Sequence, residues 1–270
     1  MRPQRIAIIG GGNLGISIAQ GLVKSQYIQA ANIIVTRRNI EKLDGLRQMG
    51  ISVMTSNVEA VKEAEYVIIA VKPKQIRQVL EEINTEANIR ARTIISVVTG
   101  VGIKEIQSVI GNSLPLFRAM PNTAIAIRES MTCISTNNAT QEQQKVVVEI
   151  FNQLGKTVMI DESLMAAATV LGACGIAYAL RFIRAASQGG IEIGFNSEIS
   201  QLIAAQTVKG AAALLLENKS HPEQEIDKVT TPQGCTIVGL NEMEHQGFSS
   251  SLIKGVITSY KKIDKIAEDF

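Results

Sequence analysis

The chain has 270 residues, which is enough for a large hydrophobic core and two domains. Its 27 basic and 25 acidic side chains give a formal net charge of +2, and no Lys or Arg run marks a nucleic-acid groove or an anionic membrane patch. Three cysteines without a CxxC pair, together with two histidines, exclude a disulfide framework and a zinc site. We therefore expect a small-molecule partner, with no nucleic acid, no membrane and no metal.

The first residues lack the apolar core and cleavage site of a signal peptide, because their apolar run is short and glycines interrupt it at once. We therefore expect a reducing, cytoplasmic setting. A later segment, residues 163–180, carries no charge and approaches the length that crosses a bilayer. Alanine and glycine are frequent in it, so we expect it to pack against another helix in a core or a subunit interface.

The first candidate site is a glycine-rich turn between an apolar strand and a helix. Ile6–Ile9 is typical of a buried parallel strand, and Ile16–Lys24 is typical of a helix. Glycines at positions 10, 12 and 15 would allow a tight turn, a close approach to a pyrophosphate and close helix packing. The pattern predicts a dinucleotide site, and the residues that we assign to it here are Ile9, Gly10, Gly12, Asn13 and Leu14.

Strands and helices alternate after this turn. The sequence predicts strands at 32–36, 65–71 and 93–98, and helices at 39–49, 74–83 and 103–110. This alternation is typical of a parallel, doubly wound α/β sheet. Three more strands are predicted at 116–120, 131–135 and 156–160, and Thr140 begins a capping box for a helix that stops at Gly155.

The character of the chain changes after residue 160, where strand-like runs disappear. Helices are predicted at 161–188, 197–217, 231–244 and 250–267. We therefore predict an N-terminal Rossmann-type domain, residues 1–160, that binds NAD(P), and a C-terminal all-helical dimerisation domain, residues 161–270. These helices carry more small and apolar surface than one short bundle can cover, so we expect an intertwined homodimer.

The end of the second strand indicates which dinucleotide is bound. An NAD site usually has Asp or Glu there, whereas this chain has Thr36, Arg37 and Arg38. A guanidinium binds a phosphate through forked hydrogen bonds, so we expect NADP, with NADPH preferred over NADH; a solvated loop is the alternative reading. Two later strand ends are predicted to line the same cleft, because ligands lie beyond the carboxyl ends of such strands. These residues are Ala70, Val71, Lys72, Pro73, Thr99 and Gly100.

A second candidate site lies near the C-terminus, where Val229–Thr236 opens a helix. Thr231 is suited to the N-cap and Pro232 to the first helical position. Gly234 leaves nearby amides uncovered, and a helix start with free amides and a positive dipole end favours a carboxylate. A capped helix with a purely structural role remains the alternative.

Several motifs occur together, in a fixed order, over essentially the whole length of the chain. Through them the chain resembles the pyrroline-5-carboxylate reductase family. That resemblance implies an oxidoreductase that uses NAD(P)H to reduce the cyclic imine 1-pyrroline-5-carboxylate to L-proline, the last step of proline biosynthesis, and that assembles its dimers into higher rings. The motifs are residues 9–14, 70–73, 118–123, 128–129, 172–178, 189–190, 221–222, 229–236 and 240–244.

The resemblance also implies roles for individual residues. The Thr231 hydroxyl and the amides of Gly234, Cys235 and Thr236 would hold the substrate carboxylate, which makes the helical domain substrate-binding as well. The Thr236 hydroxyl would meet the ring nitrogen, and Thr236 is therefore the predicted catalytic residue. Asn57 would contact the adenosine side of the cofactor. Four residues would lie on its nicotinamide side: Met120, Pro121, Asn122 and Glu162.

The chain departs from the family pattern at 171–178, where serine hydroxyls and a proline are lost, at Gln233, where glycine is usual, and at Lys228, where an asparagine can contact the cofactor. Two other functions stay open. A related NADP-dependent imine or small-acid reductase, such as a hydroxyisobutyrate-type dehydrogenase, typically needs a lysine on the helix here spanning 161–188, which contains none. A non-catalytic nucleotide-binding regulator would fit the altered 171–178 segment.

Overall fold

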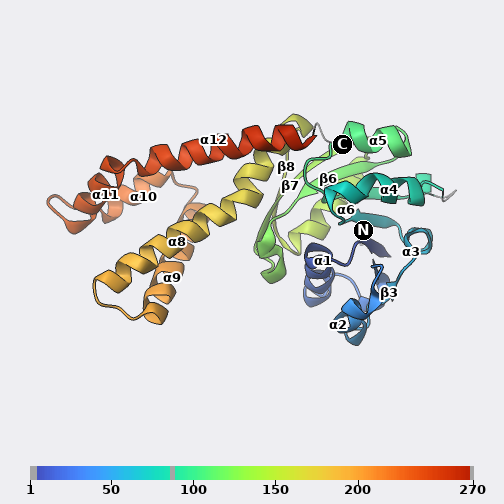
Figure 1. Cartoon of the computed structure of the whole chain (residues 1–270), viewed down its shortest axis with the longest axis horizontal. Helices are drawn as coiled ribbons and strands as arrows, with labels where there is room; N and C mark the ends of the chain where they lie inside the picture. The colour runs from blue at the N-terminus through green and yellow to red at the C-terminus, as the bar shows by residue number, and fades with distance from the viewer. Residues whose placement is uncertain (1–4, 86–88, 268–270) are drawn as a thin grey trace. The chain divides into compact units, whose positions relative to one another are not determined.

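An eight-stranded sheet organises the N-terminal part of the chain (Figure 1). The computed structural model describes residues 5–85 and 89–267. The strand order is β3-β2-β1-β4-β5-β6-β7-β8, and every neighbouring pair is parallel except β6 and β7. The predicted Rossmann-type, doubly wound sheet is confirmed. The strands are β1 (Ile6–Ile9), β2 (Ile33–Thr36), β3 (Ser52–Met54), β4 (Tyr66–Ile69), β5 (Thr93–Ser96), β6 (Leu116–Met120), β7 (Ser130–Asn137) and β8 (Gly155–Met159).

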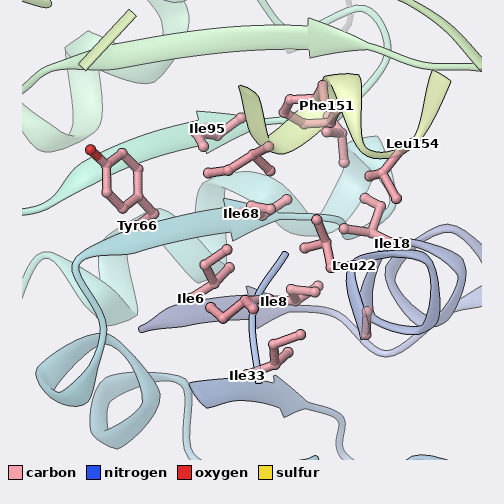
Figure 2. Close-up of a cluster of buried hydrophobic side chains, with 14 of the residues drawn as sticks. Ile6, Ile8, Ile18, Leu22, Ile33, Tyr66, Ile68, Ile95, Phe151 and Leu154 are labelled. Carbon is pink, nitrogen blue, oxygen red and sulfur yellow. The ribbon is translucent and has the colours of Figure 1, made fainter. Parts of the chain in front are cut away.

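Helices cover both faces of this sheet. Alternate residues of a strand point to opposite faces, and those of β1 are apolar on both, so each face needs a layer of helices to bury it. Ile6 and Ile8 of β1 belong to one core, shown in Figure 2, with side chains from α1 (Asn13–Lys24) and α6 (Gln141–Asn152). Ala7 and Ile9 belong to the other core. Its helices are α3 (Asn57–Glu63), α4 (Pro73–Ile83) and α5 (Ile103–Ile110).

Two local elements differ from the sequence-based expectation. The region 39–49 begins with a 3-10 turn, Ile40–Leu43, and only Asp44–Gln48 forms the α-helix α2. Asn39 favours this tighter start because its side chain accepts from Glu41 N at 3.2 Å. The sequence analysis also missed β3 and α3. The edge strand β3 has three residues, which is too short to show an alternating pattern, and α3 is a helix of only seven residues.

The helix predicted at 161–188 is present as one continuous helical segment, Glu162–Glu192, but four consecutive pieces of different helix type make it up. They are a 3-10 turn (Glu162–Leu164), α7 (Met165–Ala168), a π-helix (Thr169–Cys174) and α8 (Gly175–Glu192). A π-turn widens the helix and frees carbonyls, and Gly172 O accepts a hydrogen bond from Asn122 Nδ2 at 3.1 Å. The π-helix overlaps the segment 171–178 that departs from the family pattern.

The chain divides into two compact units: residues 1–174 with 259–270, and residues 175–258. This division differs from the boundary predicted after residue 160. Met165, Thr169 and Val170 are almost fully buried within the first unit, so the chain leaves the core of the sheet unit later than its change in composition suggests.

The second compact unit consists of helices. They are α8, α9 (Ser197–Asn218), α10 (Pro222–Val229), α11 (Cys235–His245) and the first half of α12 (Phe248–Ala267). α8 and α9 pack closely, since Ser200 Oγ donates to Ser187 O at 2.7 Å and a Cβ on Gly190 would lie 2.1 Å from Ser200 Oγ. Many large apolar side chains of this unit are exposed nevertheless, for example Leu202 and Leu216.

Two helical segments in the described part of the chain are long and apolar enough to cross a membrane, by length and composition alone. They are Glu162–Glu192 and Ser197–Asn218. The first segment contains the π-helix and buries its N-terminal residues in the sheet unit, so it is not a regular α-helix that is apolar and exposed along its whole length. Exposed apolar helix faces of this kind also suit association with another protein surface.

Candidate cofactor and substrate sites

The glycine-rich turn follows β1 and is held between the carboxyl ends of β2 and β4, the two strands that flank β1. Gly10 N and Gly11 N both donate to Thr36 O at the end of β2, at 3.2 and 2.7 Å. On the other side, Ala70 N donates to Ile9 O at 2.8 Å. Gly10 has a φ of +113°, which a residue with a side chain rarely adopts. The predicted residues of this turn and the Ala70–Pro73 strand end therefore lie together at one edge of the sheet.

The turn passes a test of fit for a pyrophosphate. A Cβ on Gly10 would lie 2.6 Å from Ala70 O, and one on Gly15 would lie 2.1 Å from Gly10 O. Gly12, the N-cap of α1, would meet nothing within 4 Å, and the first turn of α1 has no acidic side chain. Two glycines thus serve the fold, while the third leaves uncovered backbone at a helix N-terminus, where an anion is favoured.

The end of β2 carries a chain of hydrogen bonds between side chains. Thr36 Oγ1 donates to Asn57 Oδ1 at 2.6 Å, and Asn57 Nδ2 donates to Glu82 Oε2 at 2.9 Å. The structure thus brings Asn57 to the predicted adenosine end of the site and adds Glu82 from α4.

The two arginines after β2 differ in their surroundings. Arg37 Nη1 donates to Gly11 O at 2.5 Å, so its guanidinium braces the glycine-rich turn. Arg38 is exposed and makes a weaker contact of 3.4 Å, from Nη2 to Gln78 Oε1. Because only weak contacts constrain it, Arg38 is the better placed of the two to bind an added phosphate.

The next strand ends face the same edge of the sheet. Lys72 is the N-cap of α4 and Pro73 its first residue, as the strand-breaking role of the proline predicts. Thr99 Oγ1 lies 3.9 Å from Met120 Sδ, so the tips of β5 and β6 are in contact. Cys133 is paired with Met120 in the β6–β7 register, and burial raises the pKa of its thiol, which keeps it uncharged at neutral pH.

Glu162 lies in a pocket of about 250 Å³ beside the start of α5. Its Oε1 accepts from Arg118 Nη1 at 2.5 Å and from Ile103 N at 3.1 Å. Its Oε2 accepts from the Ser135 hydroxyl. Gly100, another predicted cofactor residue, lines the same pocket. The carboxylate is therefore held in a single orientation next to one of the predicted strand ends.

The loop 231–236 belongs to the second compact unit, and its local structure corrects one expectation. Thr231 is not the N-cap: Gly234 N donates to Thr231 O at 3.0 Å, which closes a turn, and Gly234 caps α11. The helix begins at Cys235, so the backbone amides of Cys235 and Thr236 lie in its first turn, where no carbonyl of the same helix can accept from them. A Cβ on Gly234 would lie 2.5 Å from Thr231 Oγ1, which explains the glycine.

Gln233 has a φ of +60°, in the position of this turn where glycine is preferred. We expect Gln233→Gly to be stabilising relative to Gln246→Gly by about 1 kcal/mol, because only the first change relieves left-handed strain. Gln246 is a matched control, since it caps the same helix at a φ of −81°. Calorimetric melting of both variants measures the difference in stability. Equal melting temperatures would contradict the prediction that the backbone at Gln233 is strained.

Sequence reasoning missed three side chains of these sites. Glu82 and Ser135 carry no local signal, because each meets its partner only through the folded sheet. Arg118 did carry a sequence signal, because an arginine inside a predicted buried strand needs a counter-charge. Glu162 supplies this charge.

Two family models match the chain. The model "Pyrroline-5-carboxylate reductase dimerisation" matches residues 162–266, and "NADP oxidoreductase coenzyme F420-dependent" matches residues 5–100. The first begins beside the change in composition that the sequence shows after residue 160. Together the two models cover the glycine-rich turn and the loop 231–236.

Individual proteins are similar over nearly all of the chain. Pyrroline-5-carboxylate reductase 2 of Dictyostelium discoideum is 45% identical over 97% of this chain and 93% of its own length. Reductase 1 of the same organism is 49% identical over 95% of this chain, which spans only 49% of that longer protein. The crystal structure of Plasmodium falciparum pyrroline carboxylate reductase with NADP bound has a TM-score of 0.88, at 25% identity, and covers 99% of both chains.

Proposed function

The chain belongs to the pyrroline-5-carboxylate reductase family, and from this premise we propose that it uses NAD(P)H to reduce 1-pyrroline-5-carboxylate to L-proline. The observation that carries the proposal is the similarity to a reductase of this name over almost the full length of both chains. The glycine-rich turn and the start of α11 support it, because the chemistry needs one anion site for a pyrophosphate and one for a carboxylate.

The substrate carboxylate is held at the start of α11 in this proposal. The amides of Cys235 and Thr236 and the hydroxyl of Thr231 donate to it, and the positive end of the helix dipole favours its charge. The amide of Gly234, also expected from the family resemblance, already donates to Thr231 O within the turn, so Gly234 contributes by leaving this helix start uncovered. The Thr236 hydroxyl orients the ring nitrogen. An imine gains a proton near neutral pH and is then already an electrophile, so these residues position the carbon and exclude water without a strong acid.

The cofactor supplies a hydride when it is bound. The uncovered backbone at Gly12 holds its pyrophosphate, with Asn13 and Leu14 at the start of α1, while Gly10 keeps the turn tight enough for this approach. Asn57 contacts its adenosine side. Two strand ends, Ala70–Pro73 and Thr99–Gly100, support its middle. On the nicotinamide side lie Met120, Pro121, Asn122 and Glu162. These assignments combine the geometry of the strand ends with the family resemblance.

We propose that NADPH is preferred and that Arg38 causes the preference. Arg38→Ala is expected to weaken NADPH binding by about 10-fold or more and NADH binding by less than about twofold, because only NADPH carries the extra phosphate. Arg37→Ala should weaken both cofactors alike, since Arg37 braces Gly11. Fluorescence titration of each cofactor measures the effects.

Arg47→Ala is the control for these two variants, because Arg47 is exposed and pairs with Asp44 within α2. It should leave both dissociation constants unchanged. Equal losses of NADPH and NADH in Arg38→Ala would overturn the assignment of Arg38 as the residue that discriminates between them.

We propose that the helical region, residues 161–270, forms a homodimer interface and that dimers assemble further. The exposed apolar faces of α8, α9 and α12 are then covered by a second copy rather than by lipid. In this proposal the enzyme works in the cytoplasm, and residues 1–160 bind the cofactor together with Glu162, which lies in the same compact unit.

One assay tests the proposed function. Purified protein is mixed with 1-pyrroline-5-carboxylate and either NADPH or NADH, and the loss of reduced-nicotinamide absorbance is followed. Oxidation of the cofactor with formation of proline is the expected result. Reduction only of other imines or small acids would indicate a related reductase, and cofactor binding without consumption would indicate a nucleotide-binding regulator.

A further inference from the structure

Three donors from three separate elements converge on the carboxylate of Glu162. The Nη1 atom of Arg118 in β6 and the backbone N of Ile103 at the start of α5 donate to Oε1, and the hydroxyl of Ser135 in β7 donates to Oε2. Arg118 and Ser135 lie directly opposite each other in the β6–β7 register. The antiparallel pairing of these strands therefore sets the spacing of the two side-chain donors.

Burial makes this arrangement rigid. The side chain of Arg118 is 8% exposed and that of Glu162 is 33% exposed. A buried guanidinium is costly unless a carboxylate faces it, and truncating either partner leaves a charge without compensation. Within the described residues, Nε of Arg118 is buried without a hydrogen-bond partner, so Glu162 carries most of the compensation.

The donors leave part of the carboxylate free. A carboxylate has about four acceptor sites, two on each oxygen. Arg118 and Ile103 use both sites on Oε1, whereas Ser135 uses one site on Oε2. Glu162 is still a third exposed and lines the pocket with Gly100 and Gly102. One acceptor site on Oε2 thus remains for a donor that enters this pocket.

We propose that Arg118 and Ser135 are positioning residues that orient Glu162, so that the free site on Oε2 accepts an N–H of the nicotinamide carboxamide. The identity of this donor rests on the proposed function, whereas the orientation of Glu162 does not. A purely structural ion pair would need Arg118 and Glu162 but would not make cofactor affinity depend on Ser135.

A double-mutant cycle tests this role without any turnover. The dissociation constant of NADPH is measured by fluorescence titration for the wild type, Ser135→Ala, Glu162→Gln and the double variant. We expect each single change to weaken binding by about 10-fold, since a hydrogen bond to a charged group is lost or its acceptor is misplaced. The double variant should match Glu162→Gln within about twofold, because Ser135 acts through Glu162.

A second pair of variants addresses the arginine. Arg118→Met should weaken NADPH binding as much as Glu162→Gln does, and Arg118→Lys should restore part of the loss because it keeps a cation. If Arg118→Met fails to fold, the Ser135 cycle decides alone. Ser108→Ala is the matched control, because the Ser108 hydroxyl is exposed and donates only to Glu105 O within α5.

Two results would overturn the proposal. One is a double variant whose loss equals the product of the two single losses, and the other is Ser135→Ala with unchanged NADPH affinity. If the wild type binds NADPH and does not reduce the imine, the proposed function fails, while the cycle still decides the role of Arg118 and Ser135.

Discussion

Gly15→Ala is expected to cost about 3 kcal/mol of folding stability and to abolish cofactor binding with it. The added Cβ would lie 2.1 Å from the carbonyl oxygen of Gly10, and neither partner is a flexible side chain that can move away. The strand–turn–helix junction must then open. Calorimetric melting and NADPH titration on the same sample measure both effects.

Gly12→Ala should separate these two effects. Nothing lies within 4 Å of a Cβ at this position, so stability should change by less than about 1 kcal/mol. NADPH affinity should still fall on the order of 100-fold, because the methyl group would occupy the space in which the pyrophosphate approaches the backbone.

Gly45→Ala is the control for both variants, since Gly45 lies in α2 and a Cβ added there would meet nothing within 4 Å. Alanine is the better helix former, so this variant should be as stable as the wild type or slightly more stable. Normal NADPH affinity in Gly12→Ala would show that the turn is only a structural connection.

Thr236→Ala is expected to lower kcat on the order of 100-fold, because a small misplacement of a reacting nitrogen is enough for a loss of that size. Its dissociation constant for NADPH should stay within about twofold of the wild type, since we assign Thr236 to the substrate alone. Steady-state kinetics with the imine and cofactor titration without it measure the two quantities separately.

Thr236→Ser keeps the hydroxyl and should recover most of the rate. Thr207→Ala, on the exposed surface of α9, is the control for the loss of a threonine methyl and hydroxyl elsewhere in the helices. An unchanged kcat/KM in Thr236→Ala would remove Thr236 from the catalytic role.

Sequence patterns predicted the elements that are determined by neighbouring residues, such as apolar spacing, glycine spacing and helix caps. β1 and the glycine-rich turn lie where their apolar and glycine spacing puts them, and Thr140 caps α6 with a capping box as expected. The start of α11 was misplaced because Thr-Pro suits both a helix N-cap and a turn, and only the fold shows that Thr231–Gly234 is a turn.

Longer-range features left no such signal. A π-turn inserts one residue without changing the apolar composition, so the pattern over 161–188 still reads as one helix. The cluster around Glu162 joins it to donors in β6, β7 and α5, which lie 27 to 59 residues from Glu162 along the chain. The carboxylate was predicted from family resemblance, whereas its donors required the sheet register.

The exposed apolar faces of the helical unit bear on how a newly made chain matures. Within this unit Ser187, Ser200 and Ala204 are buried, while large side chains such as Leu180 and Ile193 are open to water. In the homodimer proposed above, such a unit would gain much of its stability from association. Folding and assembly would then be coupled, and a chain without its partner would expose apolar surface that chaperones and proteases recognise.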